Sequence, residues 1–141
     1  GFRQLIWTDA VEHKYIEEAG TMNVMFVVND KLLTPKSSET ILSGITKRSV
    51  VDIAKDWGMT VEERKIEVDE IIKAFETGAL TEAFGAGTAA TIAPISSICF
   101  QGHNYNVPIS NSSHFHKKVM NYLSRYKVGL EGDKFNWLIT V

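Results

Sequence analysis

The stretch MNVMFVVND, residues 22–30, decides the fold because it is a nearly continuous apolar run rich in valine and phenylalanine. Its length favours a buried strand over a helix. Asn29 and Asp30 tolerate positive φ, and Pro35 ends the segment that follows, so residues 29–35 predict the return arm of a hairpin. The sequence therefore predicts a fold organised around a buried strand with a hairpin partner.

The segments on either side of this hairpin also have the character of strands. Residues 3–9 and 14–20 predict two short strands, and the charged and aliphatic alternation of residues 59–68 indicates a half-exposed one. Residues 80–102 predict a strand, a glycine-rich turn and a strand, with Pro94 at an edge or a bulge. Residues 136–141, NWLITV, predict a last strand.

Three segments have helical spacing instead. Residues 46–58 carry apolar side chains three and four positions apart and end at Gly58. Residues 69–78 begin at Asp69, a good capping residue, and residues 111–129 begin with serine caps. This order of elements predicts a single mixed α+β domain in which strands predominate and about three helices pack outside.

The composition excludes several classes of protein. The chain has 141 residues, of which 44% are hydrophobic, so it can bury a sizeable core. A net charge of −2 gives no electrostatic footprint for nucleic acid or for an acidic membrane surface. The single cysteine, Cys99, excludes an internal disulfide and a cysteine-based metal cluster. With no apolar run of bilayer length and no leader, the prediction is a cytoplasmic protein.

Two turns have residues suited to an anion. GITKRS, residues 44–49, places Gly44 and Thr46 at a predicted helix start, where free N–H groups and the helix dipole favour negative charge. The commoner alternative is that Thr46 only caps its own helix. FGAGTAAT, residues 84–91, offers glycines and the Thr88 hydroxyl, although a glycine bend between packed strands explains it equally well.

Other polar residues give weaker signals. In YIEEAGTMN, residues 15–23, strand alternation turns Glu17 and Glu18 to opposite sides, so one of them can point inward. His114 and His116 are two apart on a predicted helix and would not share a face, which argues against a metal pair. Lys47 and Arg48 are expected on a solvated face. The sequence alone predicts no metal site.

Three motifs, taken in order, resemble one family. EEAGTMNVMFV, ILSGITKRSVVDIAKDWG and EAFGAGTAATIAPI are similar in order and spacing to segments of branched-chain amino acid aminotransferases, which are fold-type IV pyridoxal-phosphate enzymes. The resemblance covers nearly the whole chain. It implies the mixed-sheet pseudo-barrel of the family's large domain, pyridoxal 5'-phosphate as cofactor, and a homodimer for the full-length protein.

The resemblance also assigns roles to particular residues. Glu18 would face the pyridine nitrogen and keep it protonated, so that the ring accepts electrons from the substrate carbanion. Ile45 and Thr46 would donate to the phosphate from the first turn, and Thr88 from the second. The implied cofactor residues are Glu18, Gly44, Ile45, Thr46, Gly87 and Thr88, and the implied substrate residues are Thr21 and Ala89.

One required residue has no counterpart. A transaminase of this kind needs a lysine that forms the internal Schiff base. In the family this lysine lies upstream of the first strand, and neither Lys14 nor Lys31 has the matching context. Because residues 3–9 already have the character of a strand, we expect the Schiff-base lysine upstream of Gly1. Residues 1–141 would then be the C-terminal cofactor-binding domain alone, without the small domain and without activity of its own.

The expected parent activity is exchange of amino groups between Leu, Ile or Val and 2-oxoglutarate. Within the same fold type, a D-amino acid aminotransferase or an aminodeoxychorismate lyase is the nearest alternative. From a different class, a non-catalytic ligand-binding domain would keep the fold without the lysine.

Overall fold

The computed structural model describes residues 2–109 and 114–139, and these residues form nine strands and three helices. The α+β class and the three helices are therefore as predicted. The strands are β1 (Ile6–Thr8), β2 (Ile16–Ala19), β3 (Met22–Val28), β4 (Lys31–Pro35), β5 (Val61–Arg64), β6 (Leu80–Gly87), β7 (Thr91–Pro94), β8 (Ser97–Phe100) and β9 (His103–Asn106). The helices are α1 (Ile45–Asp56), α2 (Val68–Glu76) and α3 (Phe115–Lys127).

The main sheet is organised around β3, the strand predicted from MNVMFVV. Along one edge β3 pairs antiparallel with β6, from Asn23 opposite Ala86 onwards. Its other edge is divided between β2, with Glu18 opposite Asn23, and β4, with Phe26 opposite Leu33. β1 and β7 extend the sheet antiparallel and β5 joins β4 in parallel, so the seven-stranded sheet is mixed. β8 and β9 form a separate hairpin.

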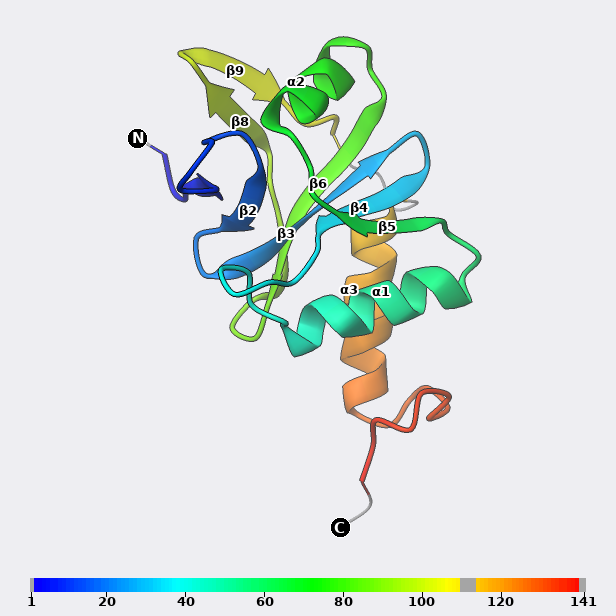
Figure 1. Ribbon diagram of the computed structural model, residues 1–141. Coiled ribbons are helices and arrows are strands. Elements are labelled where there is room, and N and C mark those ends of the chain that lie inside the picture. Colours follow the sequence, from blue (N-terminus) through cyan, green and yellow to red (C-terminus); the bar gives the residue numbers. More distant parts are fainter. Residues whose placement is uncertain (1, 110–113, 140–141) are drawn as a thin grey trace.

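Alternate side chains of β3 enter two separate parts of the core. Met25 and Val27 pack with the apolar faces of α1 and α3, whereas Val24 and Phe26 pack with α2 and the β2 side of the sheet. In Figure 1, α2 accordingly lies apart from α1 and α3. A strand that is apolar on both faces is the expected consequence of this arrangement. No helix in the described part of the chain is long and apolar enough to cross a bilayer.

The helix starts differ from the predicted caps. α1 begins at Ile45 with Gly44 as its N-cap, and α2 begins after Glu67. The prediction that Asp69 caps α2 is therefore wrong. Asp69 instead lies in the first turn, where its negative charge interacts favourably with the positive end of the helix dipole. The serines predicted to cap α3 fall at 112–113, outside the described residues.

α3 is capped from a distance by Glu82 of β6. The Glu82 carboxylate accepts hydrogen bonds from the backbone N–H groups of Phe115 (2.7 Å) and His116 (2.9 Å) and from the His116 ring (2.7 Å). Burial raises the pKa of Glu82, but the bonds from His116 and Phe115 outweigh it and lower the pKa below its usual value. His114 precedes the helix as its N-cap, so the prediction that both histidines lie on one helix is wrong.

The predicted last strand is also absent from the part of residues 136–141 that is described, 136–139. Phe135 and Trp137 instead stack on each other, with ring centroids 4.4 Å apart, and both rings contact Tyr126 of α3. Asp133 accepts hydrogen bonds from the N–H groups of Trp137 and Leu138. Aromatic packing on α3 thus orders this segment in place of strand pairing.

The glycine after α1 offers a test of the helix end. Gly58 has a φ of +79°, and a Cβ added there would meet no atom within 4 Å. Gly58→Ala should therefore cost only backbone strain, about 1 kcal/mol of unfolding free energy. Urea unfolding followed by circular dichroism measures this loss. Gly132→Ala is the control, because Gly132 has equally open space and no positive φ, and an equal loss there would contradict the explanation.

Candidate functional site

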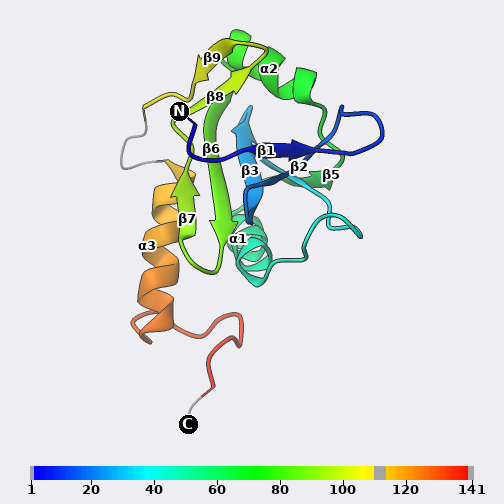
Figure 2. The same cartoon turned by 90° about the vertical axis from the view of Figure 1, so that its left-hand side faces the viewer.

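Three turns that carry the predicted site residues meet at one end of the main sheet. They are the β2–β3 turn at residues 20–21, the loop of residues 36–44 that enters α1, and the β6–β7 turn at residues 88–90. Figures 1 and 2 both place the β6–β7 turn beside the first turn of α1. The pairing of β3 with both β2 and β6 brings residues far apart in sequence to this end.

Glu18 is held by one of its two carboxylate oxygens. Its Oε1 accepts a hydrogen bond from the Leu42 N–H at 2.8 Å and lies 3.3 Å from the Asn23 Nδ2. None of the residues described donates to its Oε2. The neighbouring Glu17 is engaged separately, because its Oε1 accepts a hydrogen bond from the Thr40 hydroxyl at 2.8 Å. Glu18 is therefore a fixed carboxylate with one open oxygen.

Asn23 connects Glu18 to the loop before α1. It is 5% exposed, and its Nδ2 donates to the Leu42 carbonyl at 2.9 Å. A Cβ at Gly44 would lie 2.2 Å from the Asn23 Oδ1, so Gly44 is needed to let the loop pack against this amide. Asn23 had no predicted role, although a polar residue inside the apolar run of residues 22–30 was a usable signal.

The start of α1 has no side-chain cap. The first helical hydrogen bond runs from the Arg48 N–H to the Gly44 carbonyl, and no described residue accepts from the N–H groups of residues 45–47. The alternative that Thr46 caps its own helix is therefore wrong, because Thr46 already lies in the first turn. Unpaired N–H groups and the helix dipole together favour an anion at this position.

Lys47, in the first turn of α1, is buried against the end of β4 and the segment that follows it. Its side chain is only 2% exposed, and its Nζ donates to the Pro35 carbonyl at 2.6 Å and to the Ser37 hydroxyl at 3.2 Å. Burial lowers the pKa of Lys47 against the smaller opposing effect of Glu63, whose carboxylate lies 3.6 Å away. The prediction of a solvated face is wrong for Lys47 and correct for Arg48, which is exposed.

The second turn presents small and polar groups outward. Thr88 and Ala89 are exposed just after β6, as is Thr21 in the β2–β3 turn. A Cβ at Gly87 would lie 2.9 Å from the Met22 Cγ, so this glycine is required by packing across the sheet. The side chains of the second turn are thus accessible from outside while its glycine is fixed from within.

The donor set of this end of the sheet fits a ligand with a phosphate and a protonated ring nitrogen. Unpaired helix N–H groups and hydroxyls suit the phosphate, and the open Glu18 oxygen suits an N–H donor. Pyridoxal 5'-phosphate carries both groups.

The lysine that such a cofactor requires is not supplied by either of the two candidates in the chain. Lys14 and Lys31 take no part in the site, since they form ion pairs with Glu67 (3.0 Å) and Glu62 (3.1 Å). Gly1 lies outside the described residues, so the structure gives no contact for the start of the chain. A Schiff-base lysine upstream of Gly1 therefore stays a prediction from the sequence.

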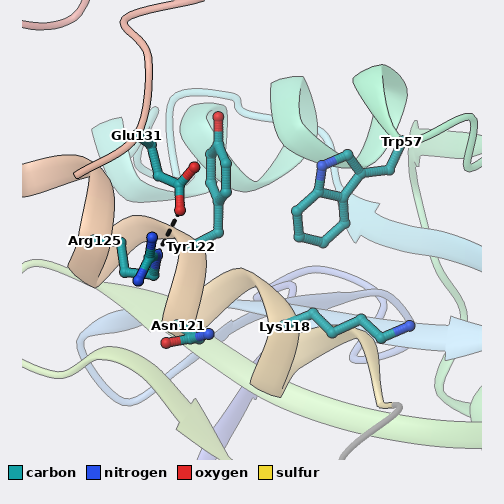
Figure 3. A pocket seen from close by; sticks show the side chains of 6 residues that line it. All are labelled: Trp57, Lys118, Asn121, Tyr122, Arg125 and Glu131. Carbon is teal, nitrogen blue, oxygen red and sulfur yellow. Dashed lines mark hydrogen bonds and ion pairs between the residues drawn. The ribbon is translucent and has the colours of Figure 1, made fainter. Parts of the chain in front are cut away.

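A shallow groove between α1 and α3 lies away from these residues. Figure 3 shows Trp57 and Tyr122 across it and the ion pair of Arg125 with Glu131. The two rings are nearly perpendicular with centroids 5.6 Å apart, and the ion pair has an N–O distance of 2.5 Å. Trp57 follows the C-terminal end of α1, opposite the end that carries residues 44–46. The groove therefore belongs to a different part of the surface and contains none of the predicted site residues.

Known proteins with similar sequences are branched-chain aminotransferases. Branched-chain-amino-acid aminotransferase 2 of Bacillus subtilis is 40% identical over 141 residues, which is 100% of this chain and 39% of that protein. A probable branched-chain-amino-acid aminotransferase of Staphylococcus aureus (strain N315) is 38% identical with the same coverage. The chain thus spans 39% of the length of each of these relatives.

Solved structures show the same relation. The branched-chain amino acid aminotransferase of Escherichia coli has a TM-score of 0.79 at 26% identity, over 99% of this chain and 42% of that one. The Thermobaculum terrenum enzyme in its PLP (holo) form has a TM-score of 0.80 at 26% identity, over 99% and 42%. The resemblance to branched-chain aminotransferases is confirmed. Since the family described as Amino-transferase class IV also matches residues 1–98, the chain belongs to the class IV amino-transferase family.

Proposed function

We propose that this chain is the C-terminal cofactor-binding domain of a branched-chain amino acid aminotransferase, which exchanges amino groups between Leu, Ile or Val and 2-oxoglutarate. The observation that carries the proposal is the connection of Glu18 to Leu42. That hydrogen bond fixes a carboxylate with one open oxygen to the loop that leads into the uncapped start of α1. One loop thereby sets the spacing between a site for a ring nitrogen and a site for a phosphate.

The residues divide between the two ends of the bound pyridoxal 5'-phosphate. At one end, the open oxygen of Glu18 would accept a hydrogen bond from the protonated ring nitrogen, and the negative charge of the carboxylate would keep the proton on that nitrogen. At the other end, the N–H groups of Ile45 and Thr46, with the hydroxyls of Thr46 and Thr88, bind the phosphate. The cofactor supplies an electron sink for the substrate carbanion, and the protein supplies its orientation.

The exposed β2–β3 and β6–β7 turns would provide the contacts to the substrate. Thr21 and Ala89 extend from the β2–β3 and β6–β7 turns beside the proposed cofactor position and would contact the amino acid. The lysine that forms the Schiff base, which we expect upstream of Gly1, and the small domain would come from the rest of the full-length protein. The full-length protein would form a homodimer. The 141 residues alone are therefore proposed to bind the cofactor without catalysing transamination.

Cofactor binding can be tested on the chain itself with pyridoxine 5'-phosphate. This probe keeps the phosphate and the ring nitrogen but has no aldehyde, so it cannot react with surface lysines. Tryptophan fluorescence or calorimetry should detect one site. Thr46→Val should weaken binding about tenfold or more, because it removes a hydrogen bond to a charged phosphate. Thr77→Val at the end of α2 should leave the affinity unchanged. Equal affinity for both variants would contradict the assignment of Thr46.

Substrate class needs the full-length protein. Turnover of leucine, D-alanine and aminodeoxychorismate should be compared under identical conditions. Preference for leucine supports the branched-chain assignment, supported already by relatives at 40% and 38% identity. Preference for either of the other two substrates would favour the alternative enzyme classes, and turnover of none would favour a non-catalytic binding domain.

A further inference from the structure

A second cluster of chemically active side chains lies between β6 and α3, apart from the proposed cofactor site. Glu82, His114 and His116 each offer one ligand atom, and these three atoms all lie within 4.8 Å of one another. Glu82 and His116 are each 5% exposed. The proposed function makes no use of this cluster. Two imidazoles and a carboxylate are a ligand set that divalent zinc takes in proteins.

His114 supplies an independent sign that a ligand belongs here. Its Nδ1 atom is buried and has no hydrogen-bond partner. An unpaired polar atom in the interior costs about 1–3 kcal/mol, so such atoms are uncommon without a compensating role. The neighbouring His116 differs, because its Nδ1 lies 2.7 Å from the Glu82 carboxylate. One histidine of the cluster is therefore fixed, and the other has a buried nitrogen available.

The three ligand atoms lie within 4.8 Å of one another, so small side-chain movements would bring them to the spacing of a metal site. Ligands bound at about 2.0–2.1 Å in a tetrahedral zinc site lie about 3.3 Å from each other. The two imidazole rings are in edge contact with centroids 5.9 Å apart, and His114 can rotate without breaking a hydrogen bond at Nδ1. Hydrogen bonds from the N–H groups of Phe115 and His116 hold the Glu82 carboxylate beside the start of α3.

We propose that Glu82, His114 and His116 form a binding site for a divalent transition-metal ion, with zinc as the best-fitting ion and water as the fourth ligand. Because Glu82 belongs to β6 and both histidines flank the start of α3, the ion would join the helix to the sheet. Its role would be to stabilise this junction. The inference does not depend on cofactor binding or on transamination.

The test is titration of the metal-free chain with zinc chloride, followed by calorimetry and by thermal unfolding. One zinc ion per chain should bind and raise the melting temperature, while magnesium should do neither. His114→Ala is the decisive variant, because no hydrogen bond of Nδ1 is lost with it. It should fold as the wild type does and bind zinc at least about tenfold more weakly.

His103→Ala provides the matched control. His103 is an exposed histidine of the β8–β9 hairpin, and its removal should leave the zinc affinity unchanged. Absence of zinc binding by the wild-type chain, or equal affinity in the His114→Ala variant, would overturn the proposal. His116→Ala adds a second measurement, since its zinc affinity should also fall by at least about tenfold.

Discussion

Glu18→Gln should reduce transamination by the full-length protein about 10²–10³-fold, mainly through kcat. Glutamine has almost the same shape, so it can still accept the hydrogen bond from the Leu42 N–H that Glu18 accepts at 2.8 Å. It carries no negative charge and would present a neutral amide to the ring nitrogen. The nitrogen would then lose its proton, and with it the ability of the ring to accept electrons. Steady-state kinetics with leucine and 2-oxoglutarate measures the effect.

Glu17→Gln is the matched control for this prediction. The two carboxylates are adjacent on β2 and similarly half-buried. Glu17 accepts its hydrogen bond from the Thr40 side chain, whereas Glu18 accepts from the Leu42 backbone and lies beside Asn23. Its replacement should change kcat by no more than about twofold, as expected for a residue away from the reacting atoms. Equal losses for Glu17→Gln and Glu18→Gln would show that the pattern of residues 17–23 has been assigned to the wrong carboxylate.

Much of the fold could be predicted from local patterns. The apolar run of residues 22–30 identified the central strand, because a strand covered on both faces is apolar at nearly every position, with Asn23 as the buried polar exception. Apolar spacing located α1 and α2 to within about two residues, the usual error at helix ends. Local patterns could not show that the strand predicted for residues 136–141 is absent from residues 136–139. Phe135 and Trp137 instead pack on Tyr126, and this contact depends on the tertiary position of α3.

The candidate site was predictable only in part, for a similar physical reason. Its motifs could be found in sequence, but the contacts that join them are long-range. Asn23 reaches Leu42 across nineteen positions, and Lys47 buries its ammonium group against the Pro35 carbonyl. Glu82 lies thirty-four positions before the histidine ring that it contacts. Residue type alone predicted that the Lys47 side chain is solvated. Its burial depends on the segment of Pro35 and Ser37 that packs over it, which the local sequence does not reveal.

Gly44→Ala should disrupt the connection between the two ends of the proposed cofactor site. The φ of Gly44 is −67°, so alanine meets no backbone strain there. Its Cβ would, however, lie 2.2 Å from the Asn23 Oδ1, and that amide is held by the Leu42 carbonyl. We expect about 1–3 kcal/mol lower stability and at least about tenfold weaker binding of pyridoxine 5'-phosphate. Urea unfolding and fluorescence titration measure the two effects.

The double variant Gly44→Ala with Asn23→Ala separates a local clash from a general loss of structure. Removing the Asn23 amide removes the atom that the new Cβ would meet, although it also leaves the Leu42 carbonyl without its donor. If the clash explains the effect, the double variant loses less affinity than the sum of the two single losses, because the residues are in contact and their effects are coupled. Additive losses would mean that the effect of Gly44→Ala arises from a contact other than the one with the Asn23 amide.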